Sequence, residues 1–333
     1  MTAHRAAIGK DRALQRASTA DGLFTILAID HQDALRRALN PEAPGSVSAA
    51  EMVGFKRQVV RSLIDDVSGV LLDPIYGAFQ AVADRSLGAK GLLVELEKAD
   101  YQMAPLPLAV EINPGWSVAN IKQMNADGVK LFFYYNPHAT DHARRQEAIV
   151  GAVAADCARL EIPFYAEPIV YRDSDQPTAT TSGWLVADAA YQISQFDVDV
   201  LKLEFPVDMK RETDPAVWRA ACEAITQAIN VPWVLLSAGV TFDLFAQQLE
   251  VACKAGASGF MVGRALWGEA AQIADVAARQ QWLQQTGRKR LQLLSAIATA
   301  YGSPWFTRRD RTPPAITPAT FRQYPNLGAG DDG

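Results

Sequence analysis

Residues 198–206 read VDVLKLEFP, an apolar run that carries a lysine at Lys202 and a glutamate at Glu204. Side chains alternate between the faces of a strand, so Val200, Lys202 and Glu204 share one face and the leucines take the other. The leucine face suits packing against helices. The opposite face, which carries Lys202, would then point into the interior of the protein. Buried lysine is rare unless it is paired. The stretch therefore holds either a structural Lys–Glu pair or a Schiff-base lysine, whose amine an apolar setting or a second cation keeps partly unprotonated.

Seven further apolar runs occur along the chain, and helical stretches separate them. The runs cover residues 24–30, 69–74, 90–96, 129–135, 163–171, 231–239 and 257–264. Helical spacing is found over 48–66, 118–124, 141–160, 182–195, 215–229 and 241–255, and two last helices are expected over 265–284 and 291–300. Eight buried strands that alternate with helices predict an α/β fold, a closed (β/α)8 TIM barrel. No glycine-rich nucleotide-binding motif follows the first strand, which argues against nucleotide folds.

The composition is that of a soluble globular protein: 333 residues, 49% hydrophobic and 21% charged. We expect a polar lead-in over residues 1–20, one barrel domain over 21–301 and an irregular tail, rich in proline and arginine, over 302–333. The net charge of −5 argues against nucleic acid as a partner. The sequence contains no apolar run of about 18 residues, so we expect no transmembrane helix. The charged N-terminal stretch has no apolar signal core, which indicates the cytoplasm. The oligomeric state stays open, a homo-oligomer included.

Cysteines and histidines indicate neither a metal site nor a disulfide framework. Cys157, Cys222 and Cys253 have no C-x-x-C spacing and are expected to be reduced thiols buried in helices. The four histidines form no H-x-H or H-E-x-x-H pattern, so a zinc site is not expected. We expect the protein to use no metal and no cofactor.

The C-terminal ends of the strands form the active-site face of such barrels. The charged residues predicted there are Asp30, Asp73, Lys130, Glu167, Lys202, Glu204 and Arg264. Lys130 matters because a neighbouring cation disfavours protonation of Lys202, which a nucleophilic amine needs. Glu167, one strand before Lys202, is placed to move protons.

Small residues end the seventh and eighth runs, as Ser237-Ala238-Gly239 and Gly263-Arg264. In barrels the loops at these positions often bind phosphate through backbone N–H groups, and Arg264 would add a charge-assisted fork. The alternative is a pair of tight turns with a surface arginine.

Seven ordered motifs carry a family resemblance. They are AIDHQDAL, LLDPIYG, EKADY, VKLFFYYN, DVLKLEFPV, PWVLLSAGV and AGASGFMVGRALW, and they span about residues 24–267. The chain resembles the class I tagatose-1,6-bisphosphate aldolase family and its relative, sulfofructosephosphate aldolase. The resemblance implies a (β/α)8 barrel that cleaves a ketose 1-phosphate or 1,6-bisphosphate through a lysine imine, without metal, to dihydroxyacetone phosphate and an aldehyde.

The resemblance also implies roles for single residues. Lys202 is similar to the family's Schiff-base lysine, Glu167 to its acid/base glutamate and Lys130 to its second lysine. Asp30 is similar to the aspartate that ends the first strand. The positions with which the family holds a phosphate fall on Ser237, Gly239, Gly263 and Arg264.

One departure from the family concerns the residues after the first strand. The family typically reads D-Q-R there, whereas this chain reads Asp30-His31-Gln32. Replacing an arginine by a neutral residue should weaken anion binding, so the second anionic end of the substrate is in doubt. A protonated His31, or Arg36 and Arg37 from the following helix, could replace the charge. His31 could equally be a packing residue.

Two other functions stay open on the sequence. A phosphosugar isomerase or epimerase could use Glu167 as an enolising base and Lys202 as an electrostatic clamp. A non-catalytic regulator could keep the pocket only to bind a sugar phosphate. Product analysis distinguishes these functions, because cleavage yields two trioses, isomerisation yields one hexose and a regulator yields no product.

Overall fold

The computed structural model describes residues 8–98, 109–171 and 182–308, and it contains a closed barrel of eight parallel strands in chain order, in which β1 pairs with both β2 and β8. The strands are β1 (Phe24–Ala28), β2 (Gly69–Leu72), β3 (Gly91–Glu95), β4 (Gly128–Tyr135), β5 (Phe164–Val170), β6 (Val200–Leu203), β7 (Trp233–Leu236) and β8 (Gly259–Val262). The predicted (β/α)8 barrel and each of its eight strands are thereby confirmed.

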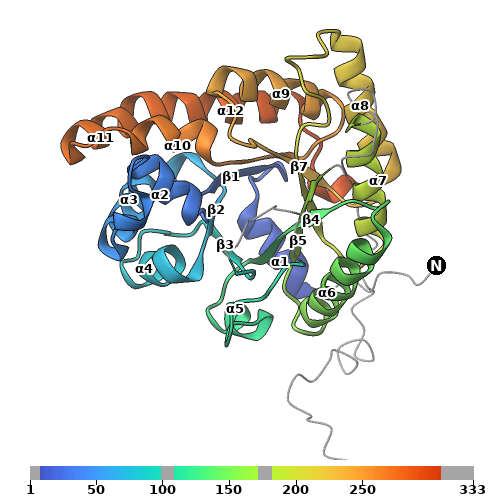
Figure 1. The fold of residues 1–333 in the computed structure, drawn as a ribbon, viewed down its shortest axis with the longest axis horizontal. Helices are drawn as coiled ribbons and strands as arrows, with labels where there is room; N and C mark the ends of the chain where they lie inside the picture. The colour runs from blue at the N-terminus through green and yellow to red at the C-terminus, as the bar shows by residue number, and fades with distance from the viewer. Residues whose placement is uncertain (1–7, 99–108, 172–181, 309–333) are drawn as a thin grey trace, which may run out of the picture.

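Helices surround the ring of strands (Figure 1). They are α2 (Asp33–Leu39), α3 (Ala49–Leu63), α4 (Phe79–Ala83), α5 (Val118–Gln123), α6 (Thr140–Arg159), α7 (Ser182–Ser194), α8 (Pro215–Ala228), α9 (Phe242–Lys254), α10 (Arg264–Ala271), α11 (Val276–Trp282) and α12 (Arg288–Tyr301). Their starts follow from local chemistry. A capping box between Ser48 and Glu51 begins α3, and Asp214 caps α8 just before its first-turn proline.

The single helix expected over 265–284 is wrong. It is divided into α10, which ends at Ala271, and α11, whose N-terminus is capped by the side chain of Asp275 accepting from Ala278 N. A new cap begins a new helix because it satisfies N–H groups that would otherwise lack partners. From α11 the chain runs through a π-helical turn, Leu283–Gly287, directly into α12.

Two apolar layers hold the barrel together. Alternate strand residues such as Phe24, Leu93 and Val200 fill the barrel interior, whereas Leu201 and Leu203 pack outward in the layer under the helices. The alternation predicted for residues 198–206 is thus confirmed. It places Lys202 on the inner face, two residues beyond Val200.

The end of the barrel at which the strands begin is closed by other parts of the chain. Helix α1 (Ile8–Ala17) lies against it (Figure 1) and contributes Leu14 and Ala17 to the inner apolar cluster. Trp305, in a 3-10 turn after α12, joins the same cluster. With this end filled, the opposite end, where the strands finish, is the side that a substrate can enter.

The three cysteines are free and buried in α6, α8 and α9, as predicted. Within the described ranges no helix combines the length and the apolar character needed to cross a bilayer. Residues 309–333, which make up most of the predicted tail, lie outside the described residues.

Candidate active site

Inward-pointing strand residues change from apolar to charged toward the C-terminal end of the barrel. Tyr165 fills the interior and Glu167 follows it on the same face of β5, as Lys202 follows Val200 on β6. Lys130 on the adjacent β4 is also buried, with its side chain 1% exposed. The alternation of each strand therefore presents charged groups to one another above an apolar floor.

Lys202 and Lys130 share one carboxylate oxygen. Lys202 Nζ lies 2.9 Å from Glu167 Oε2, and Lys130 Nζ lies 3.2 Å from the same atom. The lysine side chains are 4% and 1% exposed, so the contacts are shielded from solvent. The partner of Lys202 is thus Glu167 on the neighbouring strand. The alternative pairing with Glu204 is not what forms, since Glu204 accepts a hydrogen bond from Val170 N at 3.0 Å.

Lys130 is the centre of a larger ionic cluster. Its Nζ also lies 2.9 Å from Asp30 Oδ2 and 2.5 Å from Glu97 Oε1. Burial by itself would raise the pKa of Asp30, but Lys130 and Lys202 outweigh it and hold that pKa well below its usual value. Asp30 is therefore a carboxylate at neutral pH, in contact with the Lys130 amine.

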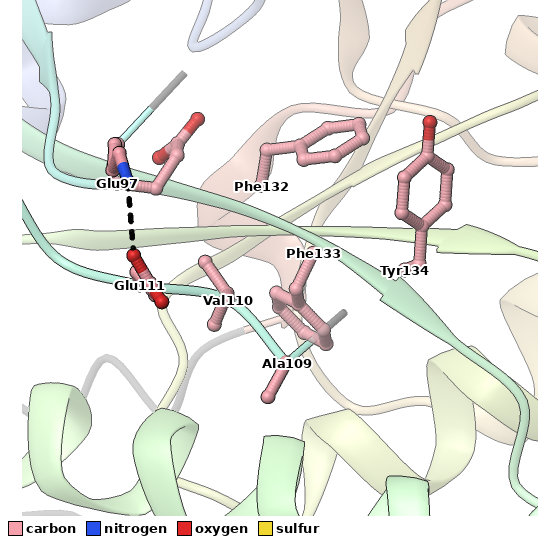
Figure 2. Close-up of a pocket in the computed structure, with 8 residues that line it drawn as sticks. Glu97, Ala109, Val110, Glu111, Phe132, Phe133 and Tyr134 are labelled. Atoms are coloured by element: carbon pink, nitrogen blue, oxygen red, sulfur yellow. Dashed lines mark hydrogen bonds and ion pairs between the residues drawn. The ribbon is translucent and has the colours of Figure 1, made fainter. Parts of the chain in front are cut away.

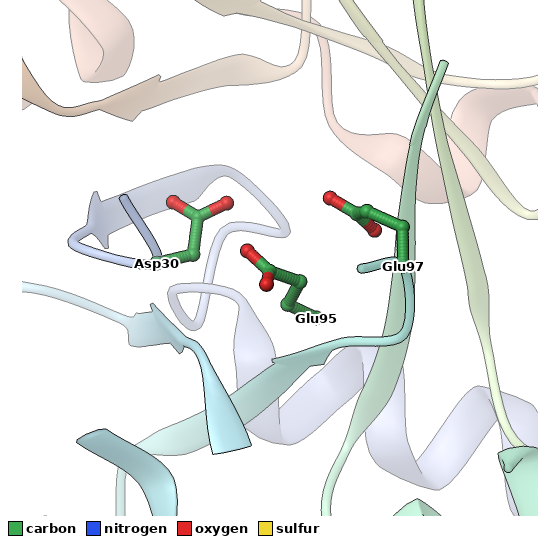
Figure 3. A group of neighbouring side chains, drawn as sticks. All are labelled: Asp30, Glu95 and Glu97. Carbon is green, nitrogen blue, oxygen red and sulfur yellow. The ribbon is translucent and has the colours of Figure 1, made fainter. Parts of the chain in front are cut away.

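Glu95 and Glu97 are the two site residues that the sequence analysis missed. Figure 3 shows their carboxyl groups converging with that of Asp30, and one oxygen from each lies within 4.8 Å of the others. Burial raises the pKa of both glutamates, and each is raised further by a carboxylate neighbour. The sequence did contain a signal for Glu95, because it lies two residues after Leu93 on β3 and therefore shares the inward face of that strand.

Three converging carboxyl groups are a possible oxygen ligand set for a cation. In this protein an ammonium group already contacts two of them, because Lys130 Nζ lies against Asp30 and Glu97. The donor set is therefore occupied by a side chain of the protein itself.

Gln32 and His31 supply no positive charge to the site at neutral pH. Gln32 Nε2 donates to Glu95 Oε1 at 3.1 Å. Burial lowers the pKa of His31 to about 3, helped by Arg264 and the two lysines and opposed by Asp30. The imidazole packs edge-on against Trp267, with the ring centroids 5.3 Å apart. A pKa this low argues against the suggestion that a protonated His31 replaces the family's arginine.

The two small-residue turns come together at the ends of β7 and β8. Gly263 N donates to Ser237 Oγ at 3.4 Å. Gly239 has a φ of +76°, and a Cβ built on it would lie 2.9 Å from Arg264 Cζ, so the guanidinium packs directly on this glycine. Ala238 also adopts a positive φ, of 45°. Backbone N–H groups, a hydroxyl and an arginine thus meet at one place, an arrangement suited to an anion.

Some charged residues predicted at the mouth do other work. Asp73 pairs with Lys56 of α3 and caps the following turn through Tyr76 N, so it stabilises the outer layer. Arg36 donates to Val47 O and to Tyr76 Oη, and these contacts hold it away from the site. Arg37 is exposed. The pKa of the Arg264 guanidinium is lowered mainly by burial, and the nearby charge of Arg37 lowers it further.

A small pocket (Figure 2) shares Glu97, a partner of Lys130, with the lysine cluster. Its lining residues are Glu97, Lys98, Ala109, Val110, Glu111, Phe132, Phe133 and Tyr134.

The chain is similar to known aldolases over most of its length. A family model described as DeoC/LacD family aldolase matches residues 24–269. Tagatose 1,6-diphosphate aldolase 2 of Enterococcus faecalis is 32% identical over 326 residues, covering 90% of this chain and 96% of the relative. Tagatose 1,6-diphosphate aldolase of Lactococcus lactis is 30% identical, covering 89% and 97%.

A solved structure has the same fold. An archaeal fructose-1,6-bisphosphate aldolase, whose catalytic lysine is covalently bound to the carbinolamine intermediate of its substrate, superimposes with a TM-score of 0.57 at 17% identity, covering 87% of this chain and 99% of that one. The match to the family model over nearly the whole barrel, together with the near-complete coverage of the curated relatives, identifies this chain as a member of the DeoC/LacD aldolase family.

Proposed function

We propose that this protein is a class I aldolase that cleaves a ketose 1-phosphate, or a 1,6-bisphosphate of the tagatose type, through a Schiff base on Lys202. The observation that carries the proposal is the setting of the Lys202 amine. It is buried at the open end of the barrel and held 2.9 Å from Glu167, with a second ammonium, Lys130, on the same carboxylate oxygen. Burial in a desolvated site, or a neighbouring cation, is how proteins make a lysine nucleophilic.

The first half of the reaction forms the imine. The unprotonated Lys202 amine adds to the C2 carbonyl to give a carbinolamine, and loss of water gives the iminium ion. Glu167 transfers the protons that this exchange requires, since its oxygen is within hydrogen-bond distance of the amine. Lys130 and Asp30, which contact each other beside the amine, orient the substrate hydroxyls.

The second half breaks the carbon–carbon bond. A base removes the proton of the C4 hydroxyl, the C3–C4 bonding electrons move into the iminium, and the aldehyde leaves. The resulting enamine takes a proton at C3, and water hydrolyses the imine to release dihydroxyacetone phosphate and the free amine. The phosphate at C1 is held by the backbone between Ser237 and Gly239, by Gly263 and by the Arg264 guanidinium.

Borohydride trapping tests the proposal. Reduction in the presence of dihydroxyacetone phosphate should attach the triose phosphate irreversibly to Lys202, and mass spectrometry of a digest locates the adduct. Lys202→Met should abolish the adduct, and activity should persist in excess chelator because no metal is involved. A competent substrate that leaves no adduct, or an adduct on Lys130 instead, would contradict the assignment of Lys202. Conversion of one hexose phosphate into another, without trioses, would favour an isomerase.

A further inference from the structure

We propose that the pocket walled by Phe132 and Tyr134 receives the aldehyde half of the substrate, and that this half ends in an uncharged hydroxylated carbon chain. The inference rests on the proposed function and adds the substrate class, a ketose 1-phosphate without a second phosphate.

The pocket adjoins the reacting lysine. Residue Phe132 of β4 is in register with Glu167 of β5, the residue that binds the Lys202 amine. Lys130 Nζ lies 5.5 Å from the centroid of the Phe132 ring and 2.5 Å from Glu97, and Phe132 and Glu97 both line the pocket. A substrate whose C2 is bonded to Lys202 would therefore extend its far carbons along this wall.

The pocket offers one unsatisfied polar group and an aromatic surface. Glu97 is completely buried, and its Oε2 atom has no hydrogen-bond partner among the residues that the structure describes. A buried carboxyl oxygen without a partner is unfavourable, and a ligand hydroxyl would satisfy it whether or not the carboxyl carries a proton. Phe132 and Tyr134 pack edge to face, with ring centroids 5.1 Å apart, and present an apolar surface to the C–H groups of a sugar chain.

The charges around the pocket disfavour a phosphate. Glu97 and Glu111 line it, and the side chain of Lys98 at its rim is already 3.2 Å from Glu111. Gln32 stands where the resemblance places an arginine, and its amide is engaged by Glu95. A phosphate dianion here would lie against the buried carboxyl group of Glu97 and near the exposed carboxylate of Glu111, and like-charge contacts of this kind are unfavourable. A terminal hydroxyl meets no such repulsion.

The test is the condensation reaction, in which dihydroxyacetone phosphate is kept constant and the aldehyde is varied. We expect kcat/KM for glyceraldehyde to exceed that for glyceraldehyde 3-phosphate by about tenfold or more. Equal or better use of the phosphorylated aldehyde would overturn the inference. It would leave the proposed function intact as long as dihydroxyacetone phosphate is still trapped on Lys202, and a loss of trapping would instead refute the function.

Two sets of variants test the pocket directly. Phe132→Leu should raise KM for glyceraldehyde without reducing trapping of dihydroxyacetone phosphate, whereas Phe79→Leu, on the outer helix α4, should change neither. Gln32→Arg should shift the preference toward glyceraldehyde 3-phosphate. Gln32→Met, which also removes the bond to Glu95 but adds no charge, should not. An unchanged KM in Phe132→Leu, or equal shifts in both Gln32 variants, would contradict the assignment.

Discussion

Replacing Lys130 by methionine should destabilise the whole barrel. The side chain is 1% exposed, and its ammonium contacts Asp30, Glu97 and Glu167 at 2.9, 2.5 and 3.2 Å. Methionine preserves much of the volume but leaves three buried carboxyl groups without their shared cation. Removing one partner of a buried ion pair destabilises a protein by about 3–5 kcal/mol, because the remaining charge stays desolvated. With three partners affected we expect about 4 kcal/mol or more.

Thermal unfolding followed by circular dichroism converts this energy into a temperature. The unfolding entropy is about 2.1 cal/mol/K per residue, or about 0.7 kcal/mol/K for 333 residues, so the melting temperature should fall by about 6 °C. Lys254→Met is the matched control. Lys254 contacts Glu250 at the same 2.5 Å distance but on an exposed helix surface, and its loss should shift the melting temperature by less than about 1 °C.

The pH dependence gives a second measure of the same substitution. The folded-state pKa of Asp30 is depressed, so this carboxylate stabilises the wild type above its usual pKa of 3.8, and the stabilisation is lost as the pH falls below that. The pKa of Glu97 is raised by burial and held down by Lys130, so without Lys130 it rises further, and acidification protonates and relieves this group. The deficit of Lys130→Met should therefore shrink as the pH falls from neutrality toward the usual carboxyl pKa values. A deficit that is small, or constant over this range, would refute the reasoning.

Three further predictions concern single residues of the site. The pKa of His31 is lowered to about 3, so its imidazole resonances should not titrate between about pH 8 and pH 5. Because the pKa in the folded protein is depressed, the free energy of unfolding should fall as the pH drops below the usual value of 6.5. His31→Asn should reduce that loss. Gly239→Ala should raise KM for dihydroxyacetone phosphate by roughly tenfold, since alanine is strained at a φ of +76° and its methyl group displaces Arg264; an unchanged KM in steady-state assays would contradict the phosphate assignment. Glu167→Gln should slow single-turnover trapping on Lys202 by about 10²–10⁴-fold, and a wild-type rate would exclude Glu167 as the proton carrier.

Much of the architecture was predictable from local pattern. Apolar runs at β-strand length, separated by helical spacing, predicted the eight strands, because burial on both faces demands such runs. The alternation in residues 198–206 placed Lys202 inward. Long helices were less certain at their ends. The break between α10 and α11 was missed because an aspartate inside a polar stretch acts as a cap only when the chain turns there.

The site itself could be predicted only in part. Lys130, Glu167 and Lys202 are brought together as expected, since they lie on the inner faces of the adjacent strands β4, β5 and β6, and Asp30, which follows β1, reaches Lys130. The importance of Glu97 was not apparent, because it lies beyond the end of β3 and becomes a partner of Lys130 only in the closed barrel.

The sequence by itself determined which residues point into the barrel, because the two-residue period of a strand is a local property that needs no other part of the chain. Only the tertiary structure decided which carboxyl group meets which amine: Lys202 contacts Glu167 on the neighbouring strand, and Glu204, two residues away, bonds to backbone instead. The physical reason is that contacts across a barrel depend on the relative stagger of its strands, and stagger is fixed when the ring closes, not by the spacing within any one strand.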